Sequence, residues 1–220
     1  MKNGSTNPNN KVTIVGEIIS DFKQSHTTYG ENFYEFLVSV KRLSGTVDVI
    51  PCIISERSFN VSKEMIGTFV SINGEYRSCN KNVNDKNILV LTVFVNNIEI
   101  TDEETANPIN KNNNNIIILE GYICKEPVYR TTPLGREITD ATIAVNRLFN
   151  KSDYIPCIFW CRNAKYISRF SVGDKVTIVG RIQSRKYTKK VDEGKTITKI
   201  TYEVSVHLIN PEYIEESNKN

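Results

Sequence analysis

The sequence has few of the residues that hold metals or form disulfides. Only two histidines occur in 220 residues, His26 and His207, and they are far apart in the chain. The five cysteines are an odd number, without the close, even spacing of a disulfide-bonded secreted domain. Cys157 and Cys161 are near each other, but a closed zinc site needs four thiolate or imidazole ligands. We therefore expect reduced thiols, no metal and no other cofactor.

Long apolar runs and catalytic motifs are also missing. No window approaches the roughly 18 apolar residues of a membrane-spanning helix, and the Asn-rich start lacks the apolar core of a signal peptide. We therefore expect a cytoplasmic protein with no membrane segment. There is no glycine-rich phosphate loop followed by Lys and Ser or Thr, no cluster of carboxylates, and no nucleophile near a base. The sequence therefore predicts a protein that is not an enzyme.

An internal repeat is the main feature that the sequence does contain. Residues 48–53 (Asp-Val-Ile-Pro-Cys-Ile) return 105 residues later as residues 153–158 (Asp-Tyr-Ile-Pro-Cys-Ile). The same interval separates Gly16 from Gly121, and after a one-residue slip in a loop it becomes 106. Self-similarity at a fixed interval indicates repeated structural units. The chain is therefore predicted to consist of one domain in two copies.

The repeat sets the predicted domain boundaries. The first unit covers residues 11–105 and the second covers residues 116–209. Between them, residues 106–115 are rich in Asn and have few apolar side chains to offset the entropy of ordering, so they are predicted to form a linker. Residues 1–10 and 210–220 have the same polar character and are predicted to be flexible tails.

Both units show the alternation of apolar and polar residues that indicates β-strands. Between the third and fourth strands of the second unit, Ala164, Ile167 and Phe170 recur every three residues before Gly173, which predicts a short helix. This order is that of the OB-fold, a five-stranded Greek-key barrel, so we predict an all-β protein with short helices and two tandem OB-folds. The predicted strands are residues 12–19, 33–40, 47–54, 68–77 and 88–98, and then 116–123, 138–145, 153–160, 175–184 and 197–208.

The two units differ in charge. The first has nine basic and thirteen acidic residues, a net charge of −4, whereas the second has sixteen and nine, a net charge of +7. A basic unit favours polyanion binding. Its densest basic run, residues 185–190 with Lys195, is predicted to lie in the loop between its fourth and fifth strands, where OB-folds bind oligonucleotides. A charge run alone is more often a solvated surface, but Tyr187 within this run favours a binding function.

Aromatic residues suited to base stacking occur in the second unit. Tyr154 and Trp160 are six residues apart on one predicted strand, an even separation that places both side chains on one face unless a bulge intervenes. Phe149 and Tyr187 fall at loop edges. Each base stacked on such a ring contributes about 1–3 kcal/mol. For Tyr154 and Phe149 the alternative of ordinary core packing stays open.

Several segments of the second unit carry a resemblance to a known family. They are residues 119–123 (Leu-Glu-Gly-Tyr-Ile), 129–135 (Tyr-Arg-Thr-Thr-Pro-Leu-Gly), 144–147 (Ala-Val-Asn-Arg), 158–160 (Ile-Phe-Trp) and 176–187. In this order and at these intervals, the segments resemble the bacterial single-stranded DNA-binding protein family, in a tandem form with two OB-folds. The first unit resembles a diverged copy of the same module.

The resemblance implies sequence-tolerant binding and protection of single-stranded DNA in replication, recombination or repair. It implies base stacking on Phe149, Tyr154, Trp160 and Tyr187. The basic candidates for phosphate contacts are Arg130, Arg136, Arg147, Arg162, Lys165, Arg181, Arg185, Lys186, Lys189 and Lys190.

The first unit is predicted to bind DNA weakly and mainly to support assembly. Val49 and Ser55 stand at the positions of Tyr154 and Trp160, so its stacking surface is predicted to be depleted. A smaller site is left open, drawn from Tyr29, Phe33, Tyr34, Tyr76 and Arg77.

The resemblance also bears on partners. It implies a homodimer that presents four OB-folds. Members of the family usually carry an acidic C-terminal tail with a hydrophobic tip. In this chain, residues 211–220 form a short tail that is only mildly acidic and lacks such a tip. Contacts with replication or repair proteins are therefore left open. Two alternatives remain: a primosomal or recombination accessory protein that acts mainly through protein contacts, and an OB module that binds RNA or protein.

Overall fold

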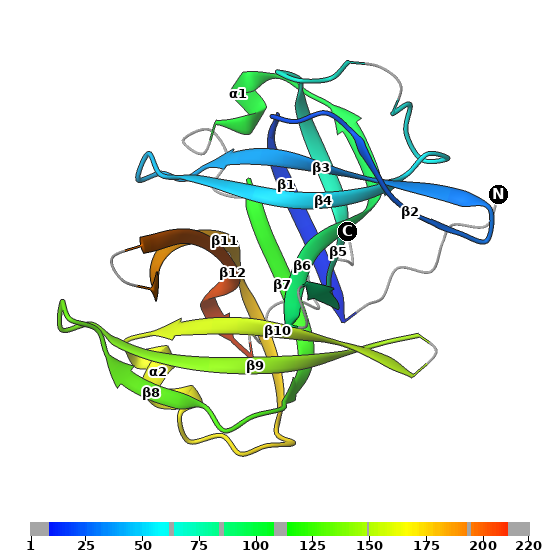
Figure 1. Ribbon diagram of the computed structural model, residues 1–220. Coiled ribbons are helices and arrows are strands. Elements are labelled where there is room, and N and C mark those ends of the chain that lie inside the picture. The colour runs from blue at the N-terminus through cyan, green and yellow to red at the C-terminus, as the bar shows by residue number, and fades with distance from the viewer. Residues whose placement is uncertain are drawn as a thin grey trace, which may run out of the picture.

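The computed structural model describes residues 9–61, 64–83, 86–107, 114–148, 150–192 and 195–210. In these ranges the chain forms two β-rich units and two short helices (Figure 1). No helix within them is long and apolar enough to cross a membrane.

The first unit contains β1 (Asn10–Ile18), β2 (Lys23–Thr28), β3 (Glu31–Lys41), β4 (Val47–Ser55), β5 (Phe69–Val83), β6 (Lys86–Ile100) and α1 (Glu103–Ala106). The second contains β7 (Asn115–Ile123), β8 (Val128–Thr131), β9 (Glu137–Arg147), β10 (Lys151–Trp160), α2 (Arg162–Ile167), β11 (Lys175–Asp192) and β12 (Lys195–Ile209).

Each unit closes on itself as a small barrel. Strand β1 pairs with both β3 and β5, and β4 pairs in parallel with β6. The second unit repeats this pattern, because β7 pairs with β9 and β11, and β10 pairs in parallel with β12. Apolar side chains at alternate positions, such as Ile14 and Phe36 in the first barrel and Ile143 and Ile178 in the second, fill the interiors. The predicted class, an all-β protein with two tandem OB-folds and a short helix in the second, is confirmed.

The sequence prediction missed two strands, β2 and β8. Each pairs with only one neighbour, β3 or β9, and lies at an edge of the sheet. The residues of β8 are all exposed, and those of β2 are exposed apart from Ser25. Because neither strand has a buried face, neither shows the apolar alternation by which strands were predicted.

The strands on either side of the predicted basic loop are much longer than expected. Strand β11 has 18 residues and β12 has 15, and their pairing continues through Arg185↔Thr201 and Lys186↔Ile200. The basic run at 185–190 is therefore part of a strand, and its prediction as a loop was wrong. A two-stranded ribbon outside the barrel has little buried face, so a polar run does not interrupt it.

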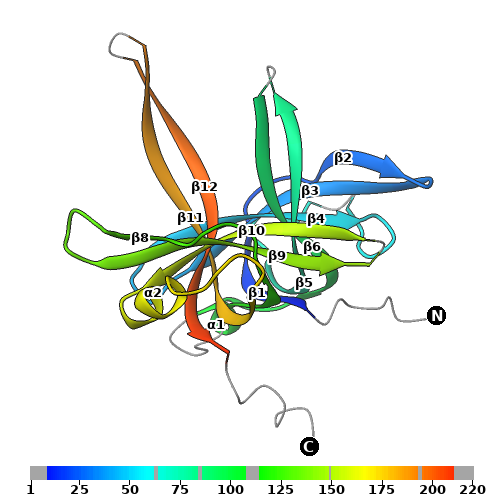
Figure 2. The same ribbon diagram turned by 90° about the horizontal axis from the view of Figure 1, so that it is seen from below.

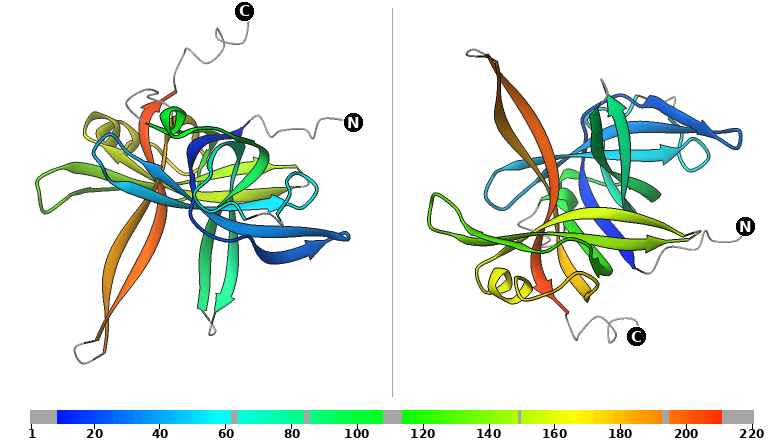
Figure 3. Two further views of the ribbon diagram at one scale, coloured as in Figure 1. Left: turned by 90° about the horizontal axis from the view of Figure 1, so that it is seen from above. Right: turned by 60° about the horizontal axis from the view of Figure 1, so that its bottom comes forward.

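Strands β5 and β6 form a similar ribbon in the first unit. Figure 2 shows that the β5–β6 arm and the β11–β12 arm project from the same side of the molecule, while α1 and α2 lie on the other side. The left view of Figure 3 shows the same arrangement. The repeat thus places two extended arms over one common surface.

The two barrels are joined by strand pairing. Strand β1 pairs antiparallel with β7 from Asn10↔Leu119 to Ile14↔Asn115, which makes one continuous 12-stranded sheet. Buried side chains of both strands, including Val12 and Ile117, belong to a single hydrophobic cluster. The pairing of β1 with β7 therefore hydrogen-bonds the backbones of the two units and also joins their hydrophobic cores.

The ends of the predicted linker belong to the folded structure. Ala106 is the last residue of α1, and Asn115 is the first of β7. Asn114 is buried, and its side-chain amide donates hydrogen bonds to the carbonyl oxygens of Lys41 at 2.8 Å and Ala106 at 3.4 Å. The predicted linker was too long at both ends, and residues 108–113 lie outside the described part of the chain.

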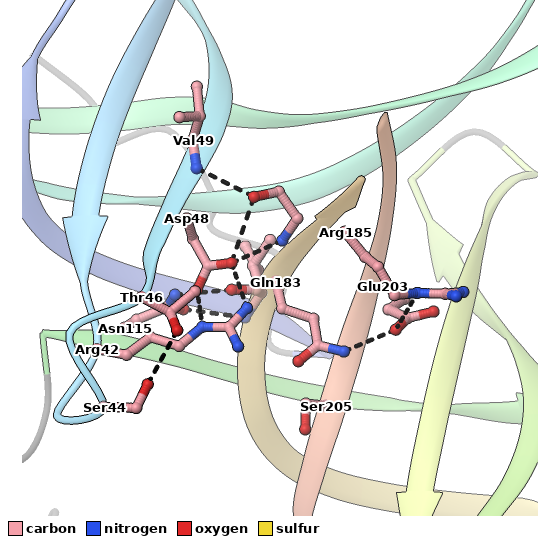
Figure 4. A network of polar contacts seen from close by, with 12 residues as sticks. Arg42, Ser44, Thr46, Asp48, Val49, Asn115, Gln183, Arg185, Glu203 and Ser205 are labelled. Carbon is pink, nitrogen blue, oxygen red and sulfur yellow. Dashed lines mark hydrogen bonds and ion pairs between the residues drawn. The ribbon is translucent and has the colours of Figure 1, made fainter. Parts of the chain in front are cut away.

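A reciprocal pair of buried contacts locks the two units together. At the first contact, a carboxylate oxygen of Asp48 in β4 accepts a hydrogen bond from the backbone N–H of Ser184 in β11 at 2.8 Å. The Ser184 hydroxyl in turn accepts from the N–H of Val49 at 3.2 Å. Arg42 donates through two nitrogens to the same carboxylate, at 2.5 and 2.6 Å (Figure 4).

The second contact is the repeat equivalent of the first. Asp153 accepts from the N–H of Ser78 at 2.6 Å, and the Ser78 hydroxyl accepts from the N–H of Tyr154 at 2.8 Å. Arg147 forms the ion pair with Asp153, at 3.0 Å. Both aspartates are fully buried. The aspartate of the repeated segment therefore serves to join the units, which explains its presence in both copies.

We expect Asp153→Ala to destabilise the fold by about 3–5 kcal/mol, because it leaves the partly buried Arg147 charge without its partner. Ser78→Ala removes the acceptor of the Tyr154 N–H and a side-chain hydrogen bond to Asp153 but leaves no charge unpaired, and we expect a cost of about 1–3 kcal/mol. Urea denaturation of the full chain measures both. Asp140→Ala breaks the exposed Arg130–Asp140 pair and is the control, with an expected effect below about 1 kcal/mol. Equal effects of Asp153→Ala and Asp140→Ala would contradict the role of the buried contact.

A glycine in β5 and its repeat equivalent in β11 allow close approach to the neighbouring strand. Gly74 and Gly180 each lie at a break in pairing register. A Cβ on Gly180 would lie 2.5 Å from the carbonyl oxygen of Ser205. The interpretation of these glycines as structural is consistent with this geometry.

Gly180→Ala should therefore destabilise the second barrel by about 1–3 kcal/mol, as expected for overpacking against rigid backbone. Gly74→Ala should do the same in the first barrel, where the added Cβ would meet the carbonyl oxygen of Phe94. Thermal denaturation of each variant checks this expectation. A variant as stable as the parent would show that the neighbouring strand can move away.

Candidate nucleic-acid interface

Strand β10 presents Tyr154 and Trp160 on its outward face. Its pairing with β9 runs without a register shift from Lys151↔Arg147 to Trp160↔Ile138. The two aromatic side chains therefore lie on the same side of the strand, as the even spacing predicted. Tyr154 is 49% exposed. Trp160 is partly exposed, and its indole N–H donates to the hydroxyl of Ser205 at 3.1 Å, which fixes one edge of the ring.

The β11–β12 arm next to β10 carries basic side chains, with Arg185 and Lys199 on one face of the ribbon and Lys186 on the other. Lys186 is exposed, and Arg185 is exposed with its guanidinium 3.7 Å from the carboxylate of Glu203 (Figure 4). Gln183 donates to the same carboxylate at 2.6 Å, so Glu203 interacts with both Arg185 and Gln183. Lys199 on β12 is exposed and pairs with position 187 across the arm. Lys199 was not among the predicted residues, because only the folded ribbon brings it opposite the basic run.

Part of the predicted site lies outside the described residues. Phe149 is not described, and neither are the side chains of Tyr187, Lys189 and Lys190. The backbones of these last three residues pair with β12.

The β8–β9 hairpin holds two more predicted residues. Arg130 is paired with Asp140 at 2.6 Å, so part of its charge is neutralised. Arg136 is exposed in the turn, and no ion pair involves it within the described ranges. Beside the turn of the hairpin, Glu137 accepts from the Tyr129 hydroxyl at 2.7 Å and pairs with Lys165 at 2.8 Å. The hydrogen bond from Lys165, then that from Tyr129, lowers the pKa of Glu137.

The structure separates four predicted residues from the arm surface. Arg147 is engaged with Asp153 in the contact between the units. Arg162 and Lys165 lie on α2, away from the arms (Figure 3). Arg181 lines a cavity at the junction of the units. Spacing along the chain could not distinguish these basic residues from those that are exposed on the arm.

The first unit has its own aromatic patch, formed by Phe33, Phe94, His26 and Arg77. The Phe33 and Phe94 ring centroids are 5.8 Å apart. The His26 ring stacks on Phe33 at 4.8 Å with an interplanar angle of 5°. The Arg77 guanidinium carbon lies 3.5 Å from the centroid of Phe94, a cation–π contact.

The register locates this patch at the place that Trp160 occupies in the second unit. Phe33 pairs with Ser55, which stands at the position of Trp160. Phe94 pairs with Ile53, as Ser205 does with Ile158 in the second unit. The predicted depletion holds for β4 itself, but neighbouring strands supply aromatic rings to the same face.

Phe33 and Arg77 belong to the candidate site that the sequence left open, whereas His26 and Phe94 were not predicted. Tyr76, also a candidate, is fully buried, so its inclusion was wrong. Phe94 corresponds to Ser205 through the strand register, and their separation is not the 105 or 106 of the other repeat pairs. A comparison at a fixed interval therefore could not find it.

Comparisons with known proteins agree with this architecture. Residues 114–209 match the model of the single-strand binding protein family. Single-stranded DNA-binding protein 1 of Staphylococcus aureus (strain COL) is 31% identical over 110 residues, which cover 47% of this chain and 65% of the relative. Single-stranded DNA-binding protein A of Bacillus subtilis (strain 168) is 32% identical over 104 residues, covering 44% and 60%. The chain thus spans less than two thirds of these relatives.

The fold of nearly the whole chain also has a counterpart among solved structures. The wild-type single-stranded DNA binding protein from Thermus aquaticus superposes with a TM-score of 0.68 at 17% identity, covering 91% of each chain. At this identity the likeness concerns the fold, and it includes both units. Residues 114–209 are therefore similar to the single-strand binding protein family, within an architecture of two tandem OB-folds.

Proposed function

We propose that this chain binds single-stranded DNA with little dependence on sequence. The observation that carries the proposal is the placement of Tyr154 and Trp160 on the outward face of β10, next to a basic two-stranded arm. Rings that stack on bases, together with cations that follow phosphates, are the two elements of such binding. The names of the relatives support this function over the accessory-protein and RNA-module alternatives.

The second unit is proposed as the main binding domain, with residues Tyr154, Trp160, Arg185, Lys186 and Lys199 in the described part of its site. The first unit offers the patch around Phe33 and Phe94 but has a net charge of −4, which opposes a polyanion. Because both arms project from one side, a strand lying along that side would reach both units (Figure 2). The first unit is thus proposed to bind weakly and to support the assembly.

The wider role is proposed to be protection of single strands during replication, recombination or repair, in the cytoplasm and by binding without catalysis. We further propose a homodimer that presents four OB-folds, with residues 11–105 and 116–209 acting as the two domains of each chain.

Trp160→Ala should weaken binding to oligo-dT by about 1–3 kcal/mol, because one base loses its stacking partner. Fluorescence anisotropy of a labelled oligonucleotide measures the affinity of the full chain. In the parent, the single tryptophan gives a second readout, since stacking should quench its emission. Tyr166→Ala, which removes a 48% exposed aromatic from α2, is the matched control and should leave affinity unchanged. Unchanged emission and an unaffected Trp160→Ala variant would contradict the proposal.

Binding should also weaken with salt, with a log–log slope of about −0.7 for each phosphate neutralised. Lys186→Gln should make this slope shallower by about 0.7, because one phosphate contact is lost. Lys175→Gln removes the same charge from the same strand, where Lys175 is paired with Glu120 at 2.9 Å, and should not alter the slope. Affinities at four or more salt concentrations measure both slopes. Equal slopes for all three proteins would remove Lys186 from the site.

A further inference from the structure

A cavity of about 360 Å³ lies at the junction of the two units and is lined by residues of both. The turn between β3 and β4 contributes Arg42 and Ser44, preceded by Lys41. The second unit contributes Arg181 from β11 and His207 from β12. The lining therefore combines three cationic side chains with a hydroxyl and an imidazole.

Two of the three cations have acidic partners. Arg42 donates two hydrogen bonds to Asp48, and Lys41 lies 3.6 Å from the carboxylate of Glu103. Arg181 differs, because its Nε is buried and has no hydrogen-bond partner among the described residues. Burial, followed by the nearby charge of Arg42, lowers the pKa of Arg181. A buried guanidinium N–H without an acceptor is unfavourable, and the Arg181 side chain to which it belongs lines the cavity.

The internal repeat provides a comparison for this charge. The interval of 106 places Glu75 at the position of Arg181. Glu75 is buried at the other junction, 3.1 Å from Arg77, where Arg147 is paired with Asp153. At equivalent positions, one junction therefore carries the acidic Glu75 and the other carries the basic Arg181. The excess positive charge around Arg181 is not a requirement of the shared fold.

His207 adds a polar group to the cavity without adding a full charge. Partial burial of its ring, followed by the charge of Arg181, lowers the pKa of His207. The imidazole is therefore mostly neutral near pH 7, and a neutral ring can donate one hydrogen bond.

We propose that the junction cavity binds a phosphate group, with Arg181 as its principal ligand and Arg42, Lys41 and His207 around it. The planar fork of a guanidinium matches two phosphate oxygens, which makes arginine better suited to this group than to a halide ion. The phosphate group could come from either of two sources. The first is a small molecule, free phosphate or a nucleotide. The second is a phosphodiester of bound single-stranded DNA. The second source rests on the proposed function, whereas the first does not.

The test is a titration of the full chain with sodium phosphate at constant ionic strength, against sodium chloride, followed by the NMR signals of the histidine rings. The chain has only two histidines, so His26→Asn assigns the signals. We expect a saturable shift of His207 with phosphate and no shift of His26. Arg181→Gln should weaken phosphate binding about tenfold or more, because the charge-assisted hydrogen bonds are lost. Lys175→Gln, with the same charge change on the same strand, should bind phosphate as the parent does.

The proposal would be overturned if phosphate and chloride had the same effect on the His207 signal of the parent chain. This outcome does not depend on whether the Arg181→Gln variant folds. Unchanged phosphate affinity in a folded Arg181→Gln variant would overturn the proposal as well.

Oligo-dT added to the phosphate-saturated chain then distinguishes the two sources of the phosphate group. A change of the His207 signal to that of a DNA-bound form assigns the cavity to a phosphodiester. Quenching of Trp160 with an unchanged His207 signal assigns it to free phosphate or a nucleotide. Failure of DNA binding itself appears separately, in the tryptophan emission.

Discussion

The antiparallel pairing of β1 with β7 is the interaction on which the rest of the structure depends. It removes an exposed edge from each barrel, brings the two cores into contact, and fixes the orientation of one unit against the other. The two buried aspartates then lock that orientation, since each accepts a backbone hydrogen bond from the opposite unit. The common direction of the two arms follows from this arrangement (Figure 2).

Within this shared frame, the two units have diverged in what they place on equivalent surfaces. The second unit carries Trp160 on β10 and a basic arm, whereas the first places Phe33 and Phe94 on neighbouring strands and has an acidic balance. The junction shows the same divergence, with Glu75 in one half and Arg181 in the other. Residues that hold the fold, such as Asp48 and Asp153, are present in both copies.

Much of the fold could be predicted from the sequence because it depends on local patterns. The repeat interval predicted two units, and the spacing of Tyr154 and Trp160 predicted their common face. The arms and the edge strands β2 and β8 could not be predicted, because paired ribbons without a buried face leave no apolar alternation. The role of Arg147 was also hidden, since its partner Asp153 becomes a buried acceptor only when the units meet. Phe94 was missed because strand register, and not chain spacing, sets its position.

The central claim is that bases stack on the outward face of β10 while the phosphates follow the β11–β12 arm. A crystal structure of the full chain with a bound oligo-dT tests this most directly. We expect bases against Tyr154 and Trp160 and the DNA backbone within hydrogen-bonding distance of Lys186. An oligonucleotide bound instead over α2, with both rings of β10 uncovered, would contradict it.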